Sequence, residues 1–592
     1  MTTNPNPDPV EIPQAEPTPQ PARMPPDREV VAQIALDLAR AESNPADSTL
    51  EAVSSDIETH GLSAYFSAAV QNMAAEEARA AQVARLPESF GVTEAPPFTV
   101  APGGGLLRRT WLDCIGSRIV QPLRVFHPET LDEVKSVILQ AEANHCRVKA
   151  VGSGHSFADV AGTRDFLVET HGLCRPLPIE EALLRPGSHP ETLFATEAGI
   201  RVQDLNETLW SAGLGLENMG GYDGQTIAGV ISTSTHGSGL AYGPLAAQAV
   251  SLTIVAAGGR VVRVEPTTGV TDPAAWSARH PEVDLKQDDD WFHAVQVGIG
   301  CMGILYSVIL RVRPRYYLKE ERTLSAWSQV RRDLQAGTVL RENDHYEVLV
   351  NPYPTRPDGD HACLITRRNP APASSVVESG PLHTRNILVE LAASVPGPSS
   401  ILLSVLNAFP WFAPNVIDGA MQAIAGDYVD RSYRVYNIGM ANEVPAYGSE
   451  IGFPLETCLD AIEQIFAISG RRQSLGQAYL TSPFSMRFVK ASPAYLSMMH
   501  GTDTCMVEFI SLDHTVGGKE LLQEIETEMY AFGGRPHWGL LNFLTGAGSL
   551  LEAMYPLLPA WQQVRFALDP QGLFGNAFTE RCGLTPHAFT RR

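Results

Sequence analysis

The stretch VGSGHSFADV, at residues 151–160, decides how the fold is interpreted. A run of hydrophobic residues ends here in a Gly-Ser-Gly turn, and His155 follows the turn at once. Glycine adopts backbone angles that other residues avoid, and it lets a ligand approach the main chain closely. Successive free amides in such a turn can form a nest for an anion. His155 is therefore a candidate ligand, base or site of covalent attachment, or an ordinary turn residue.

Strand and helix patterns alternate around this turn. PLRVFHP (122–128) predicts a short strand, ETLDEVKSVILQAEANH (129–145) a helix, and RVKAVGSGHS (147–156) a strand that runs into the turn. This order is typical of a βαβ unit. Further strand patterns follow in LFATEAGI, VSLTIVAAGG, RVVRVEP and GILYSVILRVRP. Residues 118–315 are therefore predicted to form one α/β domain.

The rest of the chain divides by composition. Residues 1–28 are rich in proline and lack the basic start and apolar core of a signal peptide, so a disordered tail is expected. Residues 29–100 carry Ala-, Glu- and Leu-rich patterns and are predicted to be a helical extension that packs or contacts a partner. Residues 316–560 mix strand and helix patterns, and residues 561–592 form a C-terminal segment.

One apolar stretch occupies residues 386–426. Prolines interrupt it, whereas a membrane-spanning helix needs about 20 unbroken apolar residues, so no transmembrane segment is expected. Two interpretations stay open. The stretch forms core-packing helices, or it forms an apolar lid that makes weak contact with lipid or a membrane surface.

Charge and cysteine content narrow the function classes. The 592 residues carry a formal net charge of −22 and a pI of about 5.2. No nucleic-acid partner is expected, because phosphate binding needs clustered Lys and Arg. None of the eight cysteines lies in a CxxC pair and no zinc spacing is present, so neither a metal site nor a disulfide framework is expected. We expect a cytoplasmic protein with reduced thiols and a small-molecule substrate.

The second informative stretch is LENMGGYDGQTIAGVISTSTHGSGLAYGPL, at residues 216–245. Glycines and small hydroxyl residues at this density suit a main chain that wraps around a large ligand with phosphates and a flat ring. A P-loop needs a lysine after its second glycine, and none is present. The dinucleotide-binding GxGxxG with its later acidic residue is also absent at 152–157.

Together, VGSGHSFADVAG, ENMGGYDGQTIAGVISTSTHGSG and VQVGIGCMGILYSVILRVRP resemble the FAD domain of the vanillyl-alcohol oxidase superfamily, in its branch of alditol and aldonolactone (gulonolactone, arabinonolactone) oxidases. GGRPHWG (533–539) and ALDPQGLFGNAF (567–578) resemble the C-terminal motifs of that branch. The resemblance implies an α+β protein. It has a two-subdomain α/β FAD-binding domain of PCMH type at 118–315, a substrate or cap domain at 316–560, and a segment at 561–592 that returns to the FAD domain.

The resemblance also implies the cofactor site. In this branch the histidine of GSGHS carries FAD covalently through the flavin 8α-methyl group, which assigns that role to His155; the alternative is a non-covalent site where His155 packs on the ring. Gly220 occupies the position whose size gates oxygen access to the flavin, which favours an oxidase, or else it forms a tight turn. The cofactor-binding residues implied are Gly152, Ser153, Gly154, His155, Ser156, Asn218, Gly220, Thr226, Gly229, Ser232, Ser234, Thr235, Gly237, Ser238, Gly303, Ile304 and Asn576.

The substrate side departs from the family pattern. Alditol oxidases carry a Glu-x-Arg element, of which this chain keeps Arg487 but has Ser485 in place of the glutamate. A lysine follows HWG in those relatives, where Leu540 stands here, and a serine follows the gate position, where Gly221 stands here. Glu450 is retained. A site that loses hydrogen-bonding groups should lose polyol binding, so the expected substrate is bulkier or less polar than a simple alditol, and sterol-oxidising members offer a precedent.

The expected reaction is hydride transfer from a carbinol carbon of an alcohol or lactone to FAD, followed by reoxidation by O2 to hydrogen peroxide. Arg487 would stabilise negative charge on the substrate oxygen or reduced flavin, or form an ion pair. His537 is a candidate proton acceptor or a structural turn residue, and Glu450 is a base or the partner of Arg487. Two alternatives are a flavin dehydrogenase that uses a quinone or dye, and a non-catalytic flavin-binding interaction module.

Overall fold

The computed structural model describes residues 99–100, 106–107, 111–113, 119–376, 385–393, 399–438, 445–546 and 548–586. The tail predicted at 1–28 lies outside these residues. The helical extension predicted at 29–100 also lies outside them, except for Thr99–Val100, which form strand β1 and pair with β2 (Leu106–Leu107). Among the described residues, no helix has the length and apolar character needed to cross a membrane.

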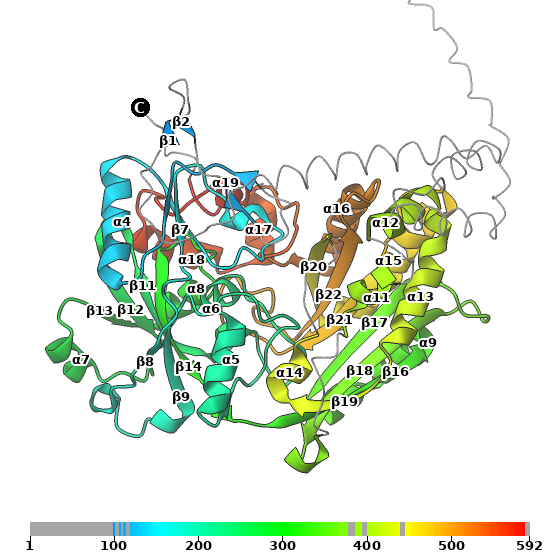
Figure 1. Cartoon of the computed structure of the whole chain (residues 1–592), viewed down its shortest axis with the longest axis horizontal. Coiled ribbons are helices and arrows are strands. Elements are labelled where there is room, and N and C mark those ends of the chain that lie inside the picture. Colours follow the sequence, from blue (N-terminus) through cyan, green and yellow to red (C-terminus); the bar gives the residue numbers. More distant parts are fainter. Residues whose placement is uncertain are drawn as a thin grey trace, which may run out of the picture. The chain divides into compact units, whose positions relative to one another are not determined.

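The βαβ unit predicted before the GSGHS turn is confirmed. Three strands form a parallel sheet in the order β5-β7-β6, with the bounds Arg124–Phe126 (β5), Phe166–Glu169 (β7) and Val148–Val151 (β6). Helix α4 (Leu131–Ala143), which is labelled in Figure 1, connects β5 to β6 along the chain. It begins at a capping box, in which Thr130 Oγ1 accepts from the Glu133 amide and the Glu133 carboxylate accepts from the Thr130 amide.

A second, six-stranded sheet follows in the order β13-β12-β11-β14-β9-β8, antiparallel except between β12 and β13. Its strands are β8 (Pro176–Leu177), β9 (Leu193–Glu197), β11 (Ala249–Val255), β12 (Val261–Glu265), β13 (Asp284–Gln287) and β14 (Ile304–Arg311). The helices of this part are α5 (Val202–Ser211), α6 (Ile227–Ser232), α7 (Pro273–Arg279) and α8 (Asp289–Gln296). The C-terminal helix α18 (Leu558–Leu568) returns to pack on α8, and Trp561 Nε1 donates to the Val297 carbonyl at 3.1 Å.

The remaining chain forms an eight-stranded antiparallel sheet in the order β19-β16-β18-β17-β21-β22-β20-β23. Its strands are β16 (Tyr317–Ala326), β17 (His345–Pro354), β18 (His361–Ala371), β19 (Gly426–Arg431), β20 (Ala446–Pro454), β21 (Phe484–Val489), β22 (Thr504–Leu512) and β23 (Arg535–Pro536). Its helices include α9 (Trp327–Ala336), α13 (Ala413–Ala423), α15 (Leu455–Ser474) and α16 (Gly518–Met529). Figure 1 shows α13 and α15 beside this sheet, and both helices contact β17.

Successive residues of a strand point to opposite sides of a sheet, and the two faces of this sheet contact different surroundings. On β21, Phe484, Met486 and Phe488 are buried, and the Phe484 ring lies 5.9 Å from that of Phe466 on α15. Ser485 and Arg487, between them, line a cavity. The sheet therefore presents one face to a hydrophobic core and the other to a binding space.

The apolar stretch at 386–426 folds into α11 (Ile387–Ala393), α12 (Ser399–Ala408) and α13, with residues 394–398 outside the description. Leu402 and Ile417 are fully buried, as expected for core-packing helices. The ends of the stretch line a cavity, however, through Ile387, Leu388 and Ile424. Both interpretations of this segment therefore keep support: its middle packs in the core and its ends face the binding space.

Candidate active site

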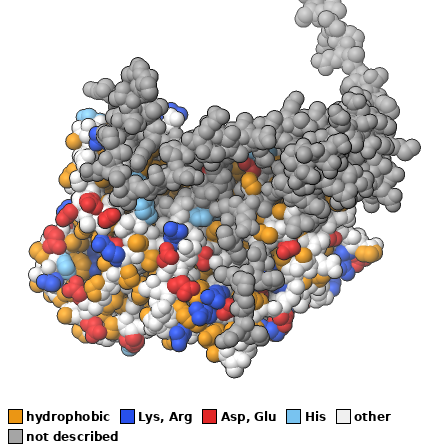
Figure 2. Space-filling model, viewed as in Figure 1, with side chains coloured by type: hydrophobic (Ala, Val, Ile, Leu, Met, Phe, Trp, Pro, Cys, Tyr) orange, Lys and Arg blue, Asp and Glu red, His pale blue; other side chains and the backbone are white. Residues whose placement is uncertain are grey.

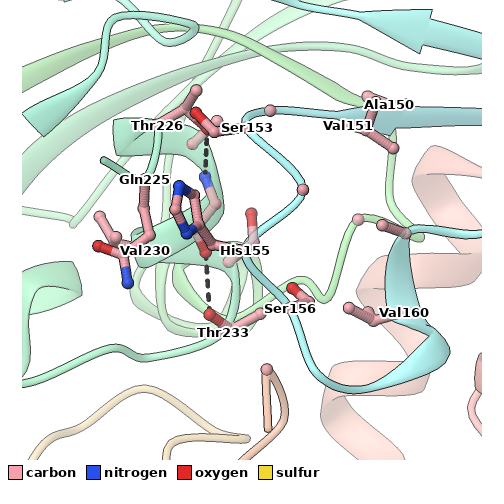
Figure 3. Close-up of a pocket in the computed structure, with 18 of the residues that line it drawn as sticks. Ala150, Val151, Ser153, His155, Ser156, Val160, Gln225, Thr226, Val230 and Thr233 are labelled. Carbon is pink, nitrogen blue, oxygen red and sulfur yellow. Dashed lines mark hydrogen bonds between the residues drawn. The ribbon is translucent and has the colours of Figure 1, made fainter. Parts of the chain in front are cut away.

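The GSGHS turn is held against the start of helix α6. Gly154 has a φ of +70°, a left-handed conformation that favours glycine. A Cβ atom at Gly152 would lie 2.0 Å from Thr226 Oγ1, so only glycine permits this approach. Thr226 caps α6, because its Oγ1 accepts from the Gly229 amide at 3.3 Å. Figure 3 shows this bond among the side chains that surround His155.

The turn borders a first cavity of about 1000 Å³, counting the space that is open to solvent. This volume is in the range of small-molecule and cofactor sites. The predicted cofactor residues that line it are Gly152, Ser153, Gly154, His155, Ser156, Thr226, Gly229, Ser232, Thr235 and Gly303. Two segments separated by some seventy positions, the GSGHS turn and the Gly/Ser/Thr-rich stretch, are thus brought onto one cavity.

The donor set of the first cavity fits FAD. Within the described residues, the amides of residues 153–156 have no hydrogen-bond acceptor, so a row of free donors is available for a pyrophosphate. Lys149 lies at the same cavity and is buried, and burial lowers the pKa of its ammonium group to about 8. Gln225 Oε1 is buried without a hydrogen-bond partner in the described part of the chain. The free amides and the unpartnered Gln225 oxygen suit a ligand that accepts and donates hydrogen bonds.

Other predicted cofactor residues lie outside the wall of the first cavity. Gly220 lines a second cavity. Asn218 Nδ2 donates to the Ser238 carbonyl at 3.2 Å, Ser234 Oγ lies 2.8 Å from Ser497 Oγ, and Ile304 is packed in a hydrophobic core. A Cβ atom at Gly237 would lie 2.4 Å from Asn218 Oδ1.

Asn576 caps helix α19 (Ala577–Arg581), and its Nδ2 donates to the carbonyls of Asp159, Val160 and Gly162. It thereby fixes the C-terminal segment to the chain just after the GSGHS turn. This position gives Asn576 an evident structural task beside the cofactor contact predicted for it.

The second cavity has a volume of about 1380 Å³ including solvent-open space, and it meets the first. Both cavities share His155, Gln225, Thr235, His537 and Leu540. The three predicted catalytic residues, Arg487, His537 and Glu450, all line the second cavity. The structure therefore brings together a candidate attachment site for the cofactor and a set of groups that can bind a substrate oxygen.

The predicted catalytic groups form one hydrogen-bonded cluster. Arg487 Nη1 lies 3.5 Å from Glu450 Oε1, and His236 Nε2 lies 3.2 Å from Glu450 Oε2. The His537 amide donates to the Glu450 carbonyl at 2.8 Å. His236 was not predicted from the sequence, although it lies within the THGSG run, because a lone histidine in a glycine-rich loop gives no local signal of a carboxylate partner.

Burial and neighbouring charges set the ionisation of this cluster. Burial alone would raise the pKa of Glu450, but His236, His537 and Arg487 lower it below its ordinary range. Burial lowers the pKa of His537 to about 4, so its imidazole is neutral near pH 7. Burial also opposes the charge of Arg487, yet the carboxylates around it raise its pKa further. The cavity therefore holds a permanent cation beside an ionised carboxylate.

Two further carboxylates of the cavity were missed by sequence reasoning. Glu347 on β17 accepts from Arg487 Nε at 3.0 Å, and Glu508 on β22 lies 2.9 Å from Arg487 Nη1. Ser485, which replaces the family glutamate, lies directly opposite Glu508 in the sheet. The neighbouring strand therefore supplies a carboxylate beside the position where Ser485 replaces the family glutamate.

The rest of the second cavity is apolar. Its lining includes Leu349, Ile387, Leu388, Ile424, Ile438, Ile510 and Leu540. Leu540, at the position of the family lysine, faces this space as the sequence comparison implied. A ligand of this cavity meets charged groups on one wall and aliphatic side chains on the other.

Among the described residues, two clusters contain the ligand types of a divalent cation site, with ligand atoms within 4.8 Å of one another. One is the buried set His236, Glu450 and His537, and the other is the set His127, Glu169 and His171 at the ends of β5 and β7. Sequence spacing predicted no metal site, because these residues are far apart along the chain. On the described part of the face in Figure 2, acidic and basic side chains are interspersed.

Comparisons with known proteins agree with this geometry. Residues 122–265 match the family model of an FAD binding domain, and residues 308–582 match that of D-arabinono-1,4-lactone oxidase. The L-gulono-1,4-lactone dehydrogenase of Mycobacterium tuberculosis is 29% identical over 479 residues, which cover 80% of this chain and 98% of that protein. The L-gulonolactone oxidase of Bos taurus is 25% identical over 472 residues, covering 78% and 95%.

Solved structures show the same fold. The crystal structure of cholesterol oxidase from Brevibacterium sterolicum matches with a TM-score of 0.61 at 15% identity, and the match covers 82% of this chain and 100% of that one. At this identity the likeness concerns the fold alone, and it confirms the predicted α+β architecture. The chain is therefore an FAD-dependent oxidoreductase, similar in sequence to the aldonolactone oxidases and dehydrogenases.

Proposed function

We propose that the chain oxidises a carbinol carbon of an alcohol or lactone, with FAD attached to His155 as the electron acceptor and O2 as the final oxidant. The observation that supports this most is the junction of the two cavities, where free amides and His155 on one side meet Arg487, Glu450 and His537 on the other. FAD, when bound, supplies the acceptor for the hydride. Binding, orientation and proton transfer then fall to this chain's own side chains.

His155 has the properties of an attachment site. Burial and the nearby Arg201 lower the pKa of its imidazole, so the neutral form with a free ring-nitrogen lone pair predominates near pH 7. Its Nε2 faces Gly224, where a Cβ atom would come within 2.9 Å. The amides of residues 153–156 would bind the pyrophosphate of the same cofactor.

The substrate side supports a molecule that is bulkier or less polar than a simple alditol. Arg487 would orient the oxygen that is oxidised and stabilise its developing negative charge. The aliphatic wall around Ile387 and Ile438 would bind an apolar part of the substrate. The names of the relatives favour a lactone, and a sterol-type alcohol is the alternative that the apolar wall favours. The ends of the 386–426 segment would act as a lid over this part and make any contact with lipid.

Oxygen as the final acceptor is supported by Gly220, which lines the second cavity. A Cβ atom there would lie 3.2 Å from the His236 carbonyl oxygen, so a side chain would narrow the space beside the site. The alternative is a dehydrogenase with another acceptor, the activity for which the M. tuberculosis relative is named. The seven described cysteines are free thiols, which is in keeping with a cytoplasmic enzyme.

The first experiment tests the flavin link and the reaction together. Wild type and His155→Ala are purified and precipitated with acid, with His171→Ala, an exposed histidine, as the control. Yellow colour should stay in the pellet of wild type and control and leave that of His155→Ala. A panel of lactones, sterols and other alcohols should then give peroxide in air.

The alternatives predict other results. Flavin reduction without peroxide would support the dehydrogenase, and Gly220→Ala should lower the peroxide rate while leaving the rate with a dye acceptor unchanged. A flavin that no alcohol or lactone reduces would point to a non-catalytic flavin-binding module. Colour released from wild type into the supernatant would exclude the covalent link.

A further inference from the structure

Three polar side chains lie in one row across the sheet that lines the second cavity. Glu508 on β22 is directly opposite Ser485 on β21 and, on its other side, directly opposite Glu450 on β20. All three line the cavity. Residues opposite each other in an antiparallel pair have Cβ atoms about 4.5–5.5 Å apart. The row therefore places two carboxylates side by side, with a short hydroxyl residue next to them.

The charges around this row are unevenly distributed. Arg487 serves three carboxylates: Glu347 through Nε at 3.0 Å, and Glu450 at 3.5 Å and Glu508 at 2.9 Å through Nη1. Glu347 has a second arginine partner, Arg368 Nη1, at 3.0 Å.

Glu450 also has a second partner, the imidazole of His236. Glu508 shares Arg487 and accepts a bond of 3.4 Å from the Ser485 hydroxyl. Of these three carboxylates, Glu508 therefore has the weakest charge compensation.

This arrangement decides which carboxyl group exchanges a proton most easily. Like charges directly opposite destabilise each other, and two carboxylates in one buried site titrate apart. Burial raises the pKa of Glu508 and Glu450 raises it further, against the opposing effect of Arg487. His236, His537 and Arg487 hold the pKa of Glu450 low, and the arginines around Glu347 lower its pKa to about 2. A base works best when its pKa is near the working pH.

We propose that Glu508 is the general base that takes the proton of the substrate hydroxyl, from a place in the cavity that Ser485 leaves open. This inference rests on the proposed function. In the step, the O–H bond breaks and its proton goes to the Glu508 carboxylate. The C=O double bond forms as the C–H bond breaks, and that hydrogen leaves with both electrons of its bond to the bound flavin. Arg487, hydrogen-bonded to Glu508, stabilises the oxygen during transfer.

The decisive measurement is the anaerobic rate of flavin reduction by a substrate of the wild type, followed by stopped flow from pH 5 to 9. Wild type should show a rate that rises with pH as Glu508 ionises. Glu508→Gln should lose about 100-fold or more, within the range for general bases, together with this pH dependence. The titrating or charged groups that face Glu508 are Glu347, Glu450 and Arg487. His236 can affect Glu508 only indirectly, through its bond to Glu450. If Glu508 is the group that titrates, His236→Gln must therefore keep the pH dependence.

Exchanging the residues at positions 508 and 485 separates the role of a general base from a purely structural role of Glu508. Glu508→Ser with Ser485→Glu moves the carboxylate to the facing position of the neighbouring strand and leaves the charge of the cavity unchanged. The double variant should regain at least about 10-fold over Glu508→Ser alone, as expected for directly opposed residues. The bound-flavin spectrum and the melting temperature report whether each variant is folded, and the double variant is compared with Glu508→Ser even if Glu508→Gln does not fold.

Two results overturn the inference. One is a Glu508→Gln rate that stays within about 3-fold of wild type with the same pH profile, and the other is a transposed variant whose rate stays at the level of Glu508→Ser. In both cases wild type still reduces its flavin, so the proposed function survives. Absence of flavin reduction in wild type with every lactone and alcohol would instead overturn the proposed function and this inference with it.

Discussion

Replacing Gly152 by alanine tests how the cofactor turn is built. A Cβ atom there would lie 2.0 Å from Thr226 Oγ1 and 2.8 Å from its Cγ2, so the threonine must move. Overpacking of this kind costs about 1–3 kcal/mol, and losing the Thr226 cap of α6 costs about 1 kcal/mol more. The free energy of unfolding should therefore fall by about 2–4 kcal/mol.

The assay is urea unfolding followed by tryptophan fluorescence, with the flavin content per chain measured on the same samples. Gly162→Ala is the matched control, because a Cβ atom there meets Val120 Cγ1 at an ordinary 3.4 Å. It should change stability by less than about 0.5 kcal/mol. Gly152→Ala should also carry less flavin, because the turn amides are displaced with the turn.

Replacing Thr226 as well tests the contact between the new Cβ atom at position 152 and the Thr226 side chain. Glycine is a nearly adequate helix cap, so Thr226→Gly alone should cost only a few tenths of a kcal/mol, about 0.3. In Gly152→Ala/Thr226→Gly the overlap is gone, and most of the lost stability should return, which appears as a coupling energy of about 2–3 kcal/mol. A single variant that keeps its flavin and full stability, or a double variant that regains nothing, would refute the packing argument.

Two further predictions concern buried charge. Glu320 lies among three buried arginines and is bonded to Arg368 Nε at 2.7 Å. Glu320→Gln should therefore lower the free energy of unfolding, measured in urea, by about 3–5 kcal/mol. Glu321→Gln is the control, because Glu321 is half-exposed, and it should cost less than about 1 kcal/mol. Burial lowers the pKa of His345 from 6.5 to about 3. As the pH drops below 6.5, the unfolded chain therefore binds a proton at this residue before the folded chain does. The free energy of unfolding should fall accordingly, by about 3 kcal/mol at pH 4. His345→Asn should flatten that part of the stability curve, and an unchanged slope would contradict the assignment.

Local rules account for what could be predicted from the sequence. The βαβ unit and the GSGHS turn depend on residues within one short segment, and the capping box at Thr130 is a four-residue pattern. The resemblance added Arg487, Glu450 and His537, which do lie on one cavity. The turn, the βαβ unit and the three catalytic candidates could be predicted because neighbouring residues or matched motifs specify them.

Pairing between strands accounts for what could not be predicted. Glu508 matters because it lies opposite Ser485, 23 positions earlier, and that register is set by the whole sheet. His236 likewise becomes a partner of Glu450 only across 214 positions. Periodicity shows that such residues share a face of a strand, but it does not show which residue of another strand stands beside them.

The alternation along strands β17, β21, β22 and β20 has a consequence for how this enzyme can change. Leu349, Ser485 and Ile510 contact the binding space, while the residues just before and after them hold the core. A side chain at such a position faces the cavity, so it can be replaced without altering the packing of its neighbours on the other face of the sheet. A substrate preference can therefore drift by single substitutions while the stability of the protein stays constant.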